Sequence, residues 1–339
     1  MMLIIMRDNI KNDRRLTPAK FRRKINRFCP HKCRYTTDRR LLPSADGVFL
    51  QPVEITEDGP DRYSPNQTFF IYLYEAPKHT FNKRMTYLPP HQINYTVGFI
   101  PGCDIYAGYG DFPLKNASYF GRETKKPKQT PKEEWEAVKS TVLNKTEPAF
   151  SVVSHCPTNS HREDYLDAFK LLYPELLNLY GRCYTEMGRS KRDMAEKMAT
   201  HHFYFAFENA ICNGYVTEKF IERARGLVVP VVLRRADYRT LLPDDSYISA
   251  DDFDSMDELA SYLKYLMKNK QAYLRYFEWT KKYERKGPDH LYRALCEACG
   301  KLYDTTKKQS YADVYLWYSW KKNCDSKFVP RLLERQLIS

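Results

Sequence analysis

The sequence lacks any hydrophobic run long enough to cross a membrane. The apolar stretch Leu3–Met6 is ended at once by Arg7 and Asp8, whereas a spanning helix needs about 20 apolar residues. If the protein is anchored in a membrane, we expect the anchor to lie outside these 339 residues.

Zinc-finger, RNA-recognition and basic-zipper patterns are also missing, although the chain is basic. Lys and Arg number 55 against 42 Asp and Glu, which gives a net charge of +13. Nucleic acid, a nucleotide sugar or an acidic membrane surface could each meet this charge. Because the basic residues are scattered, we interpret them mostly as a solvated surface with one anion-binding site, and we expect no nucleic-acid partner.

The nine cysteines include two close pairs near opposite ends of the chain. These pairs are Cys29 with Cys33 and Cys296 with Cys299. Four such cysteines could hold zinc, but the gap between the pairs is far longer than in common zinc modules. We favour two disulfides that tie the two ends of the chain together, as in an oxidising lumen. Cys156 and Cys183 end neighbouring predicted strands and form a further candidate pair, and the odd count leaves at least one cysteine without a partner in the chain.

Four N-glycosylation acceptor motifs also favour a luminal protein. They are at Asn66, Asn94, Asn116 and Asn144. One such motif is weak because the pattern is frequent by chance, but all four lie in the first half of the chain.

The clearest fold pattern lies in residues 202–233, HFYFAFENAICNGYVTEKFIERARGLVVPVVL. The aromatic run Phe203–Phe207 predicts a buried strand. Thr217 can cap a helix that begins at Glu218, and Val228–Leu233 predicts a second buried strand. Strand, helix and strand in this order form a βαβ unit, which is right-handed by default.

Ligands of open α/β sheets bind beyond the carboxyl ends of the strands. At this edge we expect a polar set that consists of Glu208, Asn209, Tyr215, Glu218 and Lys219. A carboxylate can hold ribose hydroxyls, a lysine at a helix N-terminus can hold a diphosphate, and a tyrosine can pack on a ring. The set suits a sugar nucleotide, while spacing alone also allows a plain strand-end turn and a solvated helix.

Two further charged residues follow predicted strands. Glu75 comes directly after the apolar strand Gln67–Tyr74 and would point into the cleft that this sheet edge borders. Arg162 opens a predicted helix, where its charge opposes the helix dipole. Either residue has an ordinary alternative: Glu75 as a strand-end glutamate, and Arg162 as the partner of Glu163 or Asp164.

The elements FYFAFEN, YVTEK and VPVVL resemble the donor-binding signature of the α1,3/4-fucosyltransferases, glycosyltransferase family 10. That family carries FYLAFEN, D-Y-(I/V)-T-E-K and VPVV. Gly214 departs from the family's Asp, and Arg234 from its usual glycine. The triplet Glu75-Ala76-Pro77 is similar to the family's E-S-P element, with Ala76 in place of serine. The resemblance runs from about residue 41 to residue 303.

The resemblance and the alternation of strands and helices together predict an α/β protein with two Rossmann-like, doubly wound domains facing a cleft, the GT-B architecture. The expected segments are a basic stem at 1–28, an acceptor-side domain at 29–145, a GDP-fucose-binding domain at 146–303 and a C-terminal strap at 304–339.

The activity that the resemblance implies is inverting transfer of L-fucose from GDP-β-L-fucose to a GlcNAc residue of a glycan. Glu75 would be the general base, and Arg162 and Lys219 would hold the diphosphate. Glu218 would hold the ribose, Tyr215 would pack near the nucleotide or the fucose, Asn209 would bond the donor, and Glu208 would order the cleft or face the fucose.

The same reading implies no cofactor and no divalent metal, because fixed cations can neutralise the diphosphate. It places the chain in the Golgi lumen as the catalytic part of a type II membrane protein. The alternatives are another nucleotide-sugar transferase of the same architecture and a non-catalytic glycan-binding protein. The acceptor stays open among Lewis-type glycans, GalNAcβ1-4GlcNAc and the N-glycan core.

Overall fold

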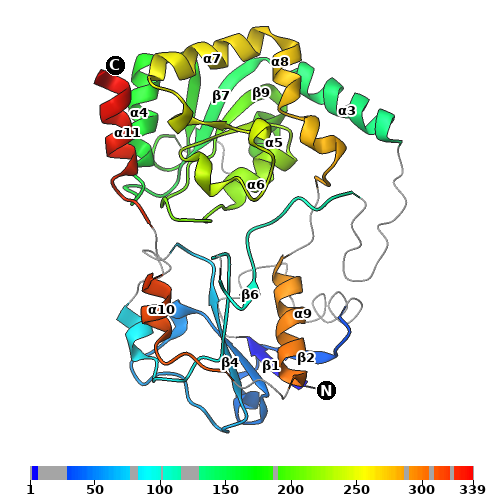
Figure 1. The fold of residues 1–339 in the computed structure, drawn as a ribbon, viewed down its shortest axis with the longest axis vertical. Coiled ribbons are helices and arrows are strands. Elements are labelled where there is room, and N and C mark those ends of the chain that lie inside the picture. Colours follow the sequence, from blue (N-terminus) through cyan, green and yellow to red (C-terminus); the bar gives the residue numbers. More distant parts are fainter. Residues whose placement is uncertain are drawn as a thin grey trace. The chain divides into compact units, whose positions relative to one another are not determined.

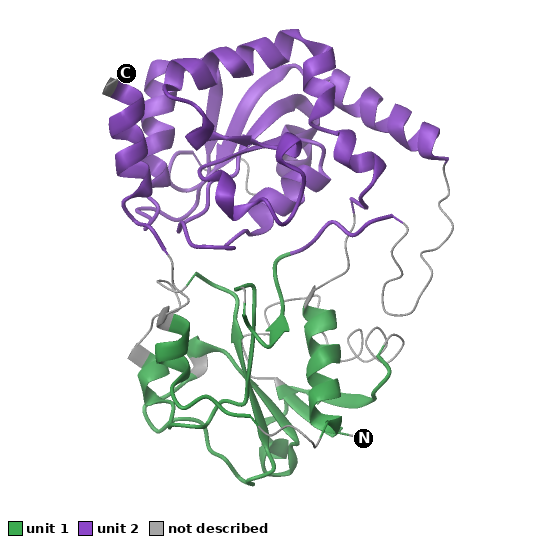
Figure 2. Ribbon diagram, in the orientation of Figure 1, with its two compact units in different colours: residues 1–109, 119–122, 288–323 green, residues 110–118, 123–287, 324–339 purple. Residues whose placement is uncertain are grey.

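The computed structural model describes residues 2–6, 29–76, 83–100, 102–115, 130–185, 190–285, 290–304, 309–320 and 324–338. The chain divides into two compact α/β units (Figure 2). Unit 1 holds residues 1–109, 119–122 and 288–323, and unit 2 holds residues 110–118, 123–287 and 324–339. The expected α/β class with two sheet-containing units is confirmed, whereas the expected boundaries at 145 and 303 differ from the observed ones.

Unit 1 is built on a six-stranded parallel sheet of order β2-β1-β3-β4-β5-β6 (Figure 1). Its strands are β1 (Met2–Met6), β2 (Cys33–Thr36), β3 (Gly47–Leu50), β4 (Thr68–Leu73), β5 (Tyr95–Gly98) and β6 (Ile105–Tyr106). Most of their side chains are buried, as expected for parallel strands covered on both faces.

Met2–Met6 is an interior strand, so the expectation that residues 1–28 form a lead-in was wrong for this segment. Ile4 and Ile5 are fully buried, and β1 pairs with β2 on one side and β3 on the other. A run of five residues is far too short for a membrane but long enough for a buried strand. Residues 7–28 lie outside the described part of the chain.

The C-terminal half of the chain returns to unit 1 through helix α9 (His290–Tyr303), which packs on β1 and β6. Its buried face includes Leu295 and Ala298, and two disulfides fix it to the start of the chain. These are Cys29–Cys296 and Cys33–Cys299, which confirms the disulfide prediction over the zinc alternative. Unit 1 also contains α10 (Val314–Trp320) and the 3-10 turns η2 (Arg39–Ser44), η3 (Pro52–Glu54) and η4 (Lys83–Tyr87).

Unit 2 is built on a five-stranded parallel sheet of order β11-β10-β9-β7-β8. Its strands are β7 (Glu147–Val152), β8 (Leu177–Tyr180), β9 (His201–Phe205), β10 (Val229–Val232) and β11 (Ile248–Ser249). The order of the strands reverses between β7 and β9. In doubly wound sheets this switch point is where ligands bind.

Helices cover both faces of this sheet. Successive side chains of β9 point to opposite faces and enter two separate apolar cores, one on each face. Phe203 and Phe205 pack with α4 (Arg162–Leu172) and α7 (Met256–Lys268), whereas Tyr204 packs with α6 (Glu218–Arg225). The remaining helices are α3 (Pro131–Leu143), α5 (Lys191–Thr200), α8 (Lys270–Arg275) and α11 (Phe328–Ile338), with 3-10 turns η5 (Arg235–Asp237), η6 (Asp244–Ser246), η7 (Ala250–Asp252) and η8 (Glu278–Lys281).

Two segments belong to unit 2 although the sequence placed them elsewhere. Helix α3 lies in the segment expected to belong to the acceptor-side domain, yet Val138 and Val142 are buried in a unit 2 core. Helix α11 lies in the expected strap, yet it packs on α4, and Gln336 accepts a hydrogen bond from Tyr165. The disulfide Cys212–Cys324, which the sequence analysis did not anticipate, fixes the start of this last segment.

The disulfide Cys156–Cys183 is formed as predicted, and Cys103 is in none of the four disulfides. Among the glycosylation candidates, Asn66 and Asn144 are exposed. Asn94 is half-buried, accepts a hydrogen bond from the Phe69 amide and donates one to the Gln309 carbonyl, so a glycan on its Nδ2 would compete with a fold contact. Asn116 lies outside the described residues. In the described ranges no helix has both the length and the apolar character to span a membrane.

Candidate functional site

The switch point of unit 2 joins the loop after β7 to the segment after β9. The Ser160 hydroxyl donates to the Glu208 carbonyl at 2.6 Å, and the Ser160 amide donates to the Asn209 carbonyl at 3.1 Å. Ser160 is fully buried. These two bonds bring the residues predicted after β9 next to the N-terminus of α4, although 48 residues separate Ser160 from Glu208.

Arg162, the first residue of α4, is buried at this junction with 3% of its surface exposed. Its Nη1 donates to the Phe207 carbonyl at 2.9 Å and its Nη2 to the His155 carbonyl at 3.1 Å. Its Nε has no hydrogen-bond partner among the described residues. The guanidinium is therefore held by one carbonyl from each strand end.

The ion pair that would have given Arg162 an ordinary role is not formed within the described chain. Glu163 instead accepts hydrogen bonds from the amide and hydroxyl of Thr158, and Asp164 pairs with His161. A buried cation in the first turn of a helix, whose partners in the described part of the chain are neutral carbonyls, carries positive charge that can bind an anion.

Glu208 and Lys219 form a buried ion pair at the N-terminus of α6. The Lys219 Nζ is 3.0 Å from Glu208 Oε2, and Glu208 is 4% exposed. The Thr217 amide and hydroxyl also donate to the Glu208 carboxylate, each at 2.8 Å. Thr217 is the N-cap of α6, and its hydroxyl accepts a bond from Lys219 Nζ at 2.9 Å. One carboxylate thus fixes both the helix cap and the lysine.

The charges of Glu208 and Arg162 both affect the pKa of Lys219. Burial raises the pKa of Glu208, and the Lys219 ammonium acts in the opposite direction. Burial disfavours the charged form of Lys219, but Glu208 and Glu218 outweigh it and raise the lysine's pKa. The positive charge of Arg162 acts to lower the pKa of Lys219, so the two cations are near enough to repel each other. An anion bound between them would relieve that repulsion.

The remaining donor-side candidates differ in access. Glu218 opens α6, and 53% of its side chain is exposed. Asn209 is half-buried, and its Oδ1 has no hydrogen-bond partner in the described residues. Tyr215 is only 2% exposed, so its ring packs inside unit 2 rather than offering a face to solvent. The structure thus places the polar groups of Arg162, Glu208, Asn209, Glu218 and Lys219 at one strand edge, whereas the Tyr215 ring packs inside unit 2.

Glu75 belongs to unit 1, where it follows the carboxyl end of β4 as predicted. Glu75 is half-buried, and its backbone carbonyl accepts a hydrogen bond from the Tyr318 hydroxyl at 2.8 Å. Tyr318 and Ser160 were not predicted from the sequence, and Thr217 was predicted only as a helix cap. Nothing local to these residues in the chain indicates the partners that they reach.

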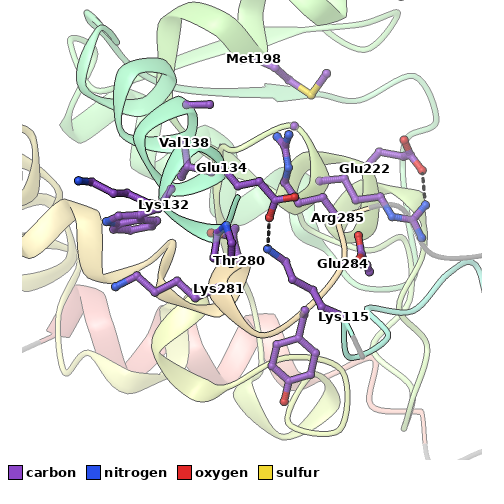
Figure 3. Close-up of a pocket in the computed structure, with 16 residues that line it drawn as sticks. Lys115, Lys132, Glu134, Val138, Met198, Glu222, Thr280, Lys281, Glu284 and Arg285 are labelled. Carbon is purple, nitrogen blue, oxygen red and sulfur yellow. Dashed lines mark hydrogen bonds and ion pairs between the residues drawn. The ribbon is translucent and has the colours of Figure 1, made fainter. Parts of the chain in front are cut away.

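A separate groove in unit 2 has a volume of about 920 Å³ and runs along α3, the second half of α6 and residues 280–285 (Figure 3). It contains none of the predicted site residues. Lys115 pairs with Glu134 and Arg225 with Glu222, so much of its charge is internally compensated. Within the described residues, no group of three or more His, Cys, Asp or Glu side chains is placed to hold a metal ion.

Comparison with known proteins identifies the family. A family model described as glycosyltransferase family 10 (fucosyltransferase), C-terminal part, matches residues 142–317. The chain is similar to alpha-(1,3)-fucosyltransferase fut-1 of Caenorhabditis elegans, with 32% identity over 88% of this chain and 66% of the relative. It is also similar to the 3-galactosyl-N-acetylglucosaminide 4-alpha-L-fucosyltransferase FUT3 of Bos taurus, with 30% identity over 84% of this chain and 74% of the relative.

A solved structure shares the fold. It is a crystal structure of an alpha1,3-fucosyltransferase with GDP-fucose, which aligns with a TM-score of 0.57 and 19% identity over 91% of this chain and 92% of that one. The chain spans slightly less than two thirds of the nematode relative's length. The match of the family model to half of the chain, together with these relatives, shows that the chain belongs to glycosyltransferase family 10, the fucosyltransferases.

Proposed function

We propose that the protein is an inverting α1,3-fucosyltransferase that moves L-fucose from GDP-β-L-fucose to a GlcNAc hydroxyl of a glycan. The observation that carries this proposal is the pair of cations at the switch point of unit 2, of which Arg162 is buried and Lys219 half-buried. Among the described residues, Arg162 donates its hydrogen bonds to carbonyls alone, and Lys219 is fixed by Glu208 and Thr217. The names of the relatives, which are α1,3- and α1,4-fucosyltransferases, support this choice of donor and acceptor class.

On the donor side, the diphosphate gains negative charge as the bond to the fucose breaks. Arg162 and Lys219 are already oriented, so they stabilise this charge without a reorganisation cost. Glu218, exposed at the first turn of α6, suits the ribose hydroxyls. Asn209 can bond the donor through its Oδ1, a buried atom that has no hydrogen-bond partner among the described residues. Because these two cations neutralise the leaving group, we propose that no divalent metal and no cofactor are required.

On the acceptor side, Glu75 takes the proton from the attacking hydroxyl as it reaches the anomeric carbon. General-base catalysis by a positioned side chain contributes typically about 10²–10⁴-fold to a rate. Displacement by the hydroxyl inverts the β-linked donor to an α-linked product.

We further propose that the protein works in the Golgi lumen as the catalytic part of a membrane-anchored enzyme. Four disulfides support an oxidising compartment, since such bonds are rare in the cytosol.

The test is fucose transfer from labelled GDP-fucose to a panel of Lewis-type, GalNAcβ1-4GlcNAc and N-glycan core acceptors. Glu75→Gln should lower turnover by about 10²–10⁴-fold while GDP binding survives, and the exposed Asp58→Asn in the same unit serves as the matched control. Loss of GDP binding in Glu75→Gln would instead place that residue on the donor side.

Lys219→Ala should weaken GDP affinity, and an unchanged affinity would remove Lys219 from the site. Competition by UDP but not by GDP would favour another nucleotide-sugar transferase, and the absence of turnover with retained glycan binding would favour a non-catalytic protein.

A further inference from the structure

Two tyrosine hydroxyls bond the backbone at and just before Glu75. The β4–β5 ladder ends where Leu73 lies opposite Gly98, so the next two carbonyls of the chain fall beyond it. The Tyr74 carbonyl accepts a hydrogen bond from the Tyr109 hydroxyl at 2.6 Å, and the Glu75 carbonyl accepts one from the Tyr318 hydroxyl at 2.8 Å.

The two tyrosines come from separate parts of unit 1. Tyr109 follows β6 and lies 35 residues from Tyr74, and Tyr318 lies in α10, 243 residues from Glu75. Tyr318 is fully buried, so its hydroxyl has lost contact with solvent and is directed by the packing around it. The backbone beyond the end of a strand usually moves more than the strand itself. Here the carbonyls of Tyr74 and Glu75 are both held by hydroxyls of buried or half-buried tyrosines.

The segment that carries Tyr318 is itself fixed to the sheet. The Asp104 carboxylate accepts bonds from Gln309 Nε2 at 2.7 Å and from the Tyr311 hydroxyl at 2.8 Å. The Tyr311 ring packs edge-on against Trp317 with centroids 5.2 Å apart. Asp104 directly precedes β6, and the Tyr311 amide donates to the carbonyl of Ile93, which precedes β5. Residues 309–320 therefore form a brace that runs from the amino-terminal side of β5 and β6 to the carboxyl end of β4.

We propose that Tyr109 and Tyr318 are positioning residues for Glu75, and that the brace of residues 309–320 sets the place of the catalytic carboxylate. The inference rests on the proposed role of Glu75 as general base. Neither tyrosine touches the substrate in this proposal. They act through the backbone, because the Cα of Glu75 determines where its carboxylate can reach, and a displacement of about 1 Å in a reacting group can cost roughly 10²-fold in rate.

Unit 1 offers a matched control for the hydroxyl. Tyr35 is also buried and also donates to a backbone carbonyl, that of Leu295, at 2.9 Å. It lies on β2, which β1 and β3 separate from β4. Tyr35→Phe removes the same kind of hydrogen bond as Tyr318→Phe at a comparable cost in stability, but far along the sheet from Glu75.

The experiment compares Tyr109→Phe, Tyr318→Phe, the double variant and Tyr35→Phe, because phenylalanine keeps each ring in place. For Tyr109→Phe and Tyr318→Phe we expect kcat to fall by about 10-fold or more, with KM for GDP-fucose and the Kd for GDP unchanged. Tyr35→Phe should keep the kcat of the wild type. The melting temperatures of all three single variants should fall by similar amounts.

A double-mutant cycle with Glu75→Asp isolates the route of the effect. Because aspartate already withdraws the carboxylate by one methylene, Tyr318→Phe should cost much less kcat in that background than in the wild type. An equal loss in both backgrounds, or a kcat in Tyr109→Phe and Tyr318→Phe no lower than in Tyr35→Phe, overturns the inference. Failure of the proposed function is a separate result: it is an unchanged turnover in Glu75→Gln, or no fucose transfer by the wild type, and neither depends on the tyrosines.

Discussion

The Lys219 ammonium lies 3.0 Å from the carboxylate of Glu208, a residue with only 4% of its surface exposed. Glu208 follows the carboxyl end of β9, and Lys219 lies in the first turn of α6, so the ion pair joins the end of a strand to the start of a helix. A lysine normally loses side-chain entropy when it grips a phosphate. If Lys219 binds the donor diphosphate as proposed, much of that entropy is already lost on folding, because the ion pair orients the amine before the donor binds.

Replacing Glu208 by glutamine should therefore weaken GDP binding without any loss of a donor contact. The amide leaves the buried Lys219 without its nearest counter-charge, so burial is less opposed and the lysine's pKa should fall. We expect a loss of about 10-fold in GDP affinity at neutral pH, equivalent to about 1.4 kcal/mol. The loss should grow as the pH rises, because the variant releases the Lys219 proton at a lower pH than the wild type.

Isothermal titration with GDP between pH 6.5 and pH 9 measures this effect. Glu222→Gln is the control, since it removes an exposed carboxylate from the same helix, paired with Arg225. Equal losses in both variants, or a pH dependence identical to that of the wild type, would show that Glu208 does not act through Lys219.

Local sequence patterns were sufficient for the donor edge. The aromatic run of β9, the Thr217 cap and the strand β10 lie within about 30 residues of sequence, and the structure places them as the pattern predicts. The role of Glu208 was left open, because a carboxylate after a strand looks the same whether it faces a ligand or a buried lysine.

Contacts between distant segments were beyond the sequence analysis. Met2–Met6 is too short to be recognised as a strand by itself, and its partners begin about 30 and 45 residues later. The return of α9 to unit 1 and of α11 to unit 2 depends on which buried surface each helix finds, which its own periodicity does not specify. Cys212 and Cys324 are 112 residues apart, and nothing in their spacing marks them as a pair.

Removing the Cys33–Cys299 disulfide should destabilise unit 1. The bond joins residues that are 266 apart in the sequence, both cysteines are fully buried, and Cys299 lies in α9. Loss of a native disulfide typically costs about 2–5 kcal/mol. We expect Cys33→Ser combined with Cys299→Ser to lower the first thermal unfolding transition by several degrees, as followed by differential scanning calorimetry.

Cys103→Ser is the control for this change, because Cys103 is in the same unit and in none of the four disulfides. Non-reducing peptide mapping should also recover the Cys29–Cys296 and Cys33–Cys299 peptides. Free thiols at all four positions would contradict the stapled arrangement of unit 1.

Chelation of divalent metals should leave fucose transfer unchanged. In the proposed mechanism, Arg162 and Lys219 supply the positive charge that a bound ion supplies in a metal-dependent transferase. Turnover measured after dialysis against EDTA should equal turnover in the presence of added Mn²⁺ or Mg²⁺. A loss of activity with EDTA that Mn²⁺ restores would show that the two cations are not sufficient for the leaving diphosphate.

Acid should destabilise the protein through His201 at the start of β9. This histidine is 5% exposed, and burial lowers its pKa to about 4 from an ordinary value of 6.5. Between pH 6.5 and about pH 4, the His201 imidazole is protonated in the unfolded chain but stays neutral in the folded chain. The free energy of unfolding therefore decreases as the pH falls through this range. The loss in the free energy of unfolding should approach about 3 kcal/mol by pH 4, at about 1.4 kcal/mol for each unit of pKa.

Urea unfolding at pH 7, 5.5 and 4.5 should show a smaller drop in midpoint for His201→Gln than for the wild type. His31→Gln, at an exposed position in unit 1, should keep the full drop. The same drop in all three proteins would assign the acid sensitivity to other groups, because only His201 among the two substituted histidines is buried in the fold.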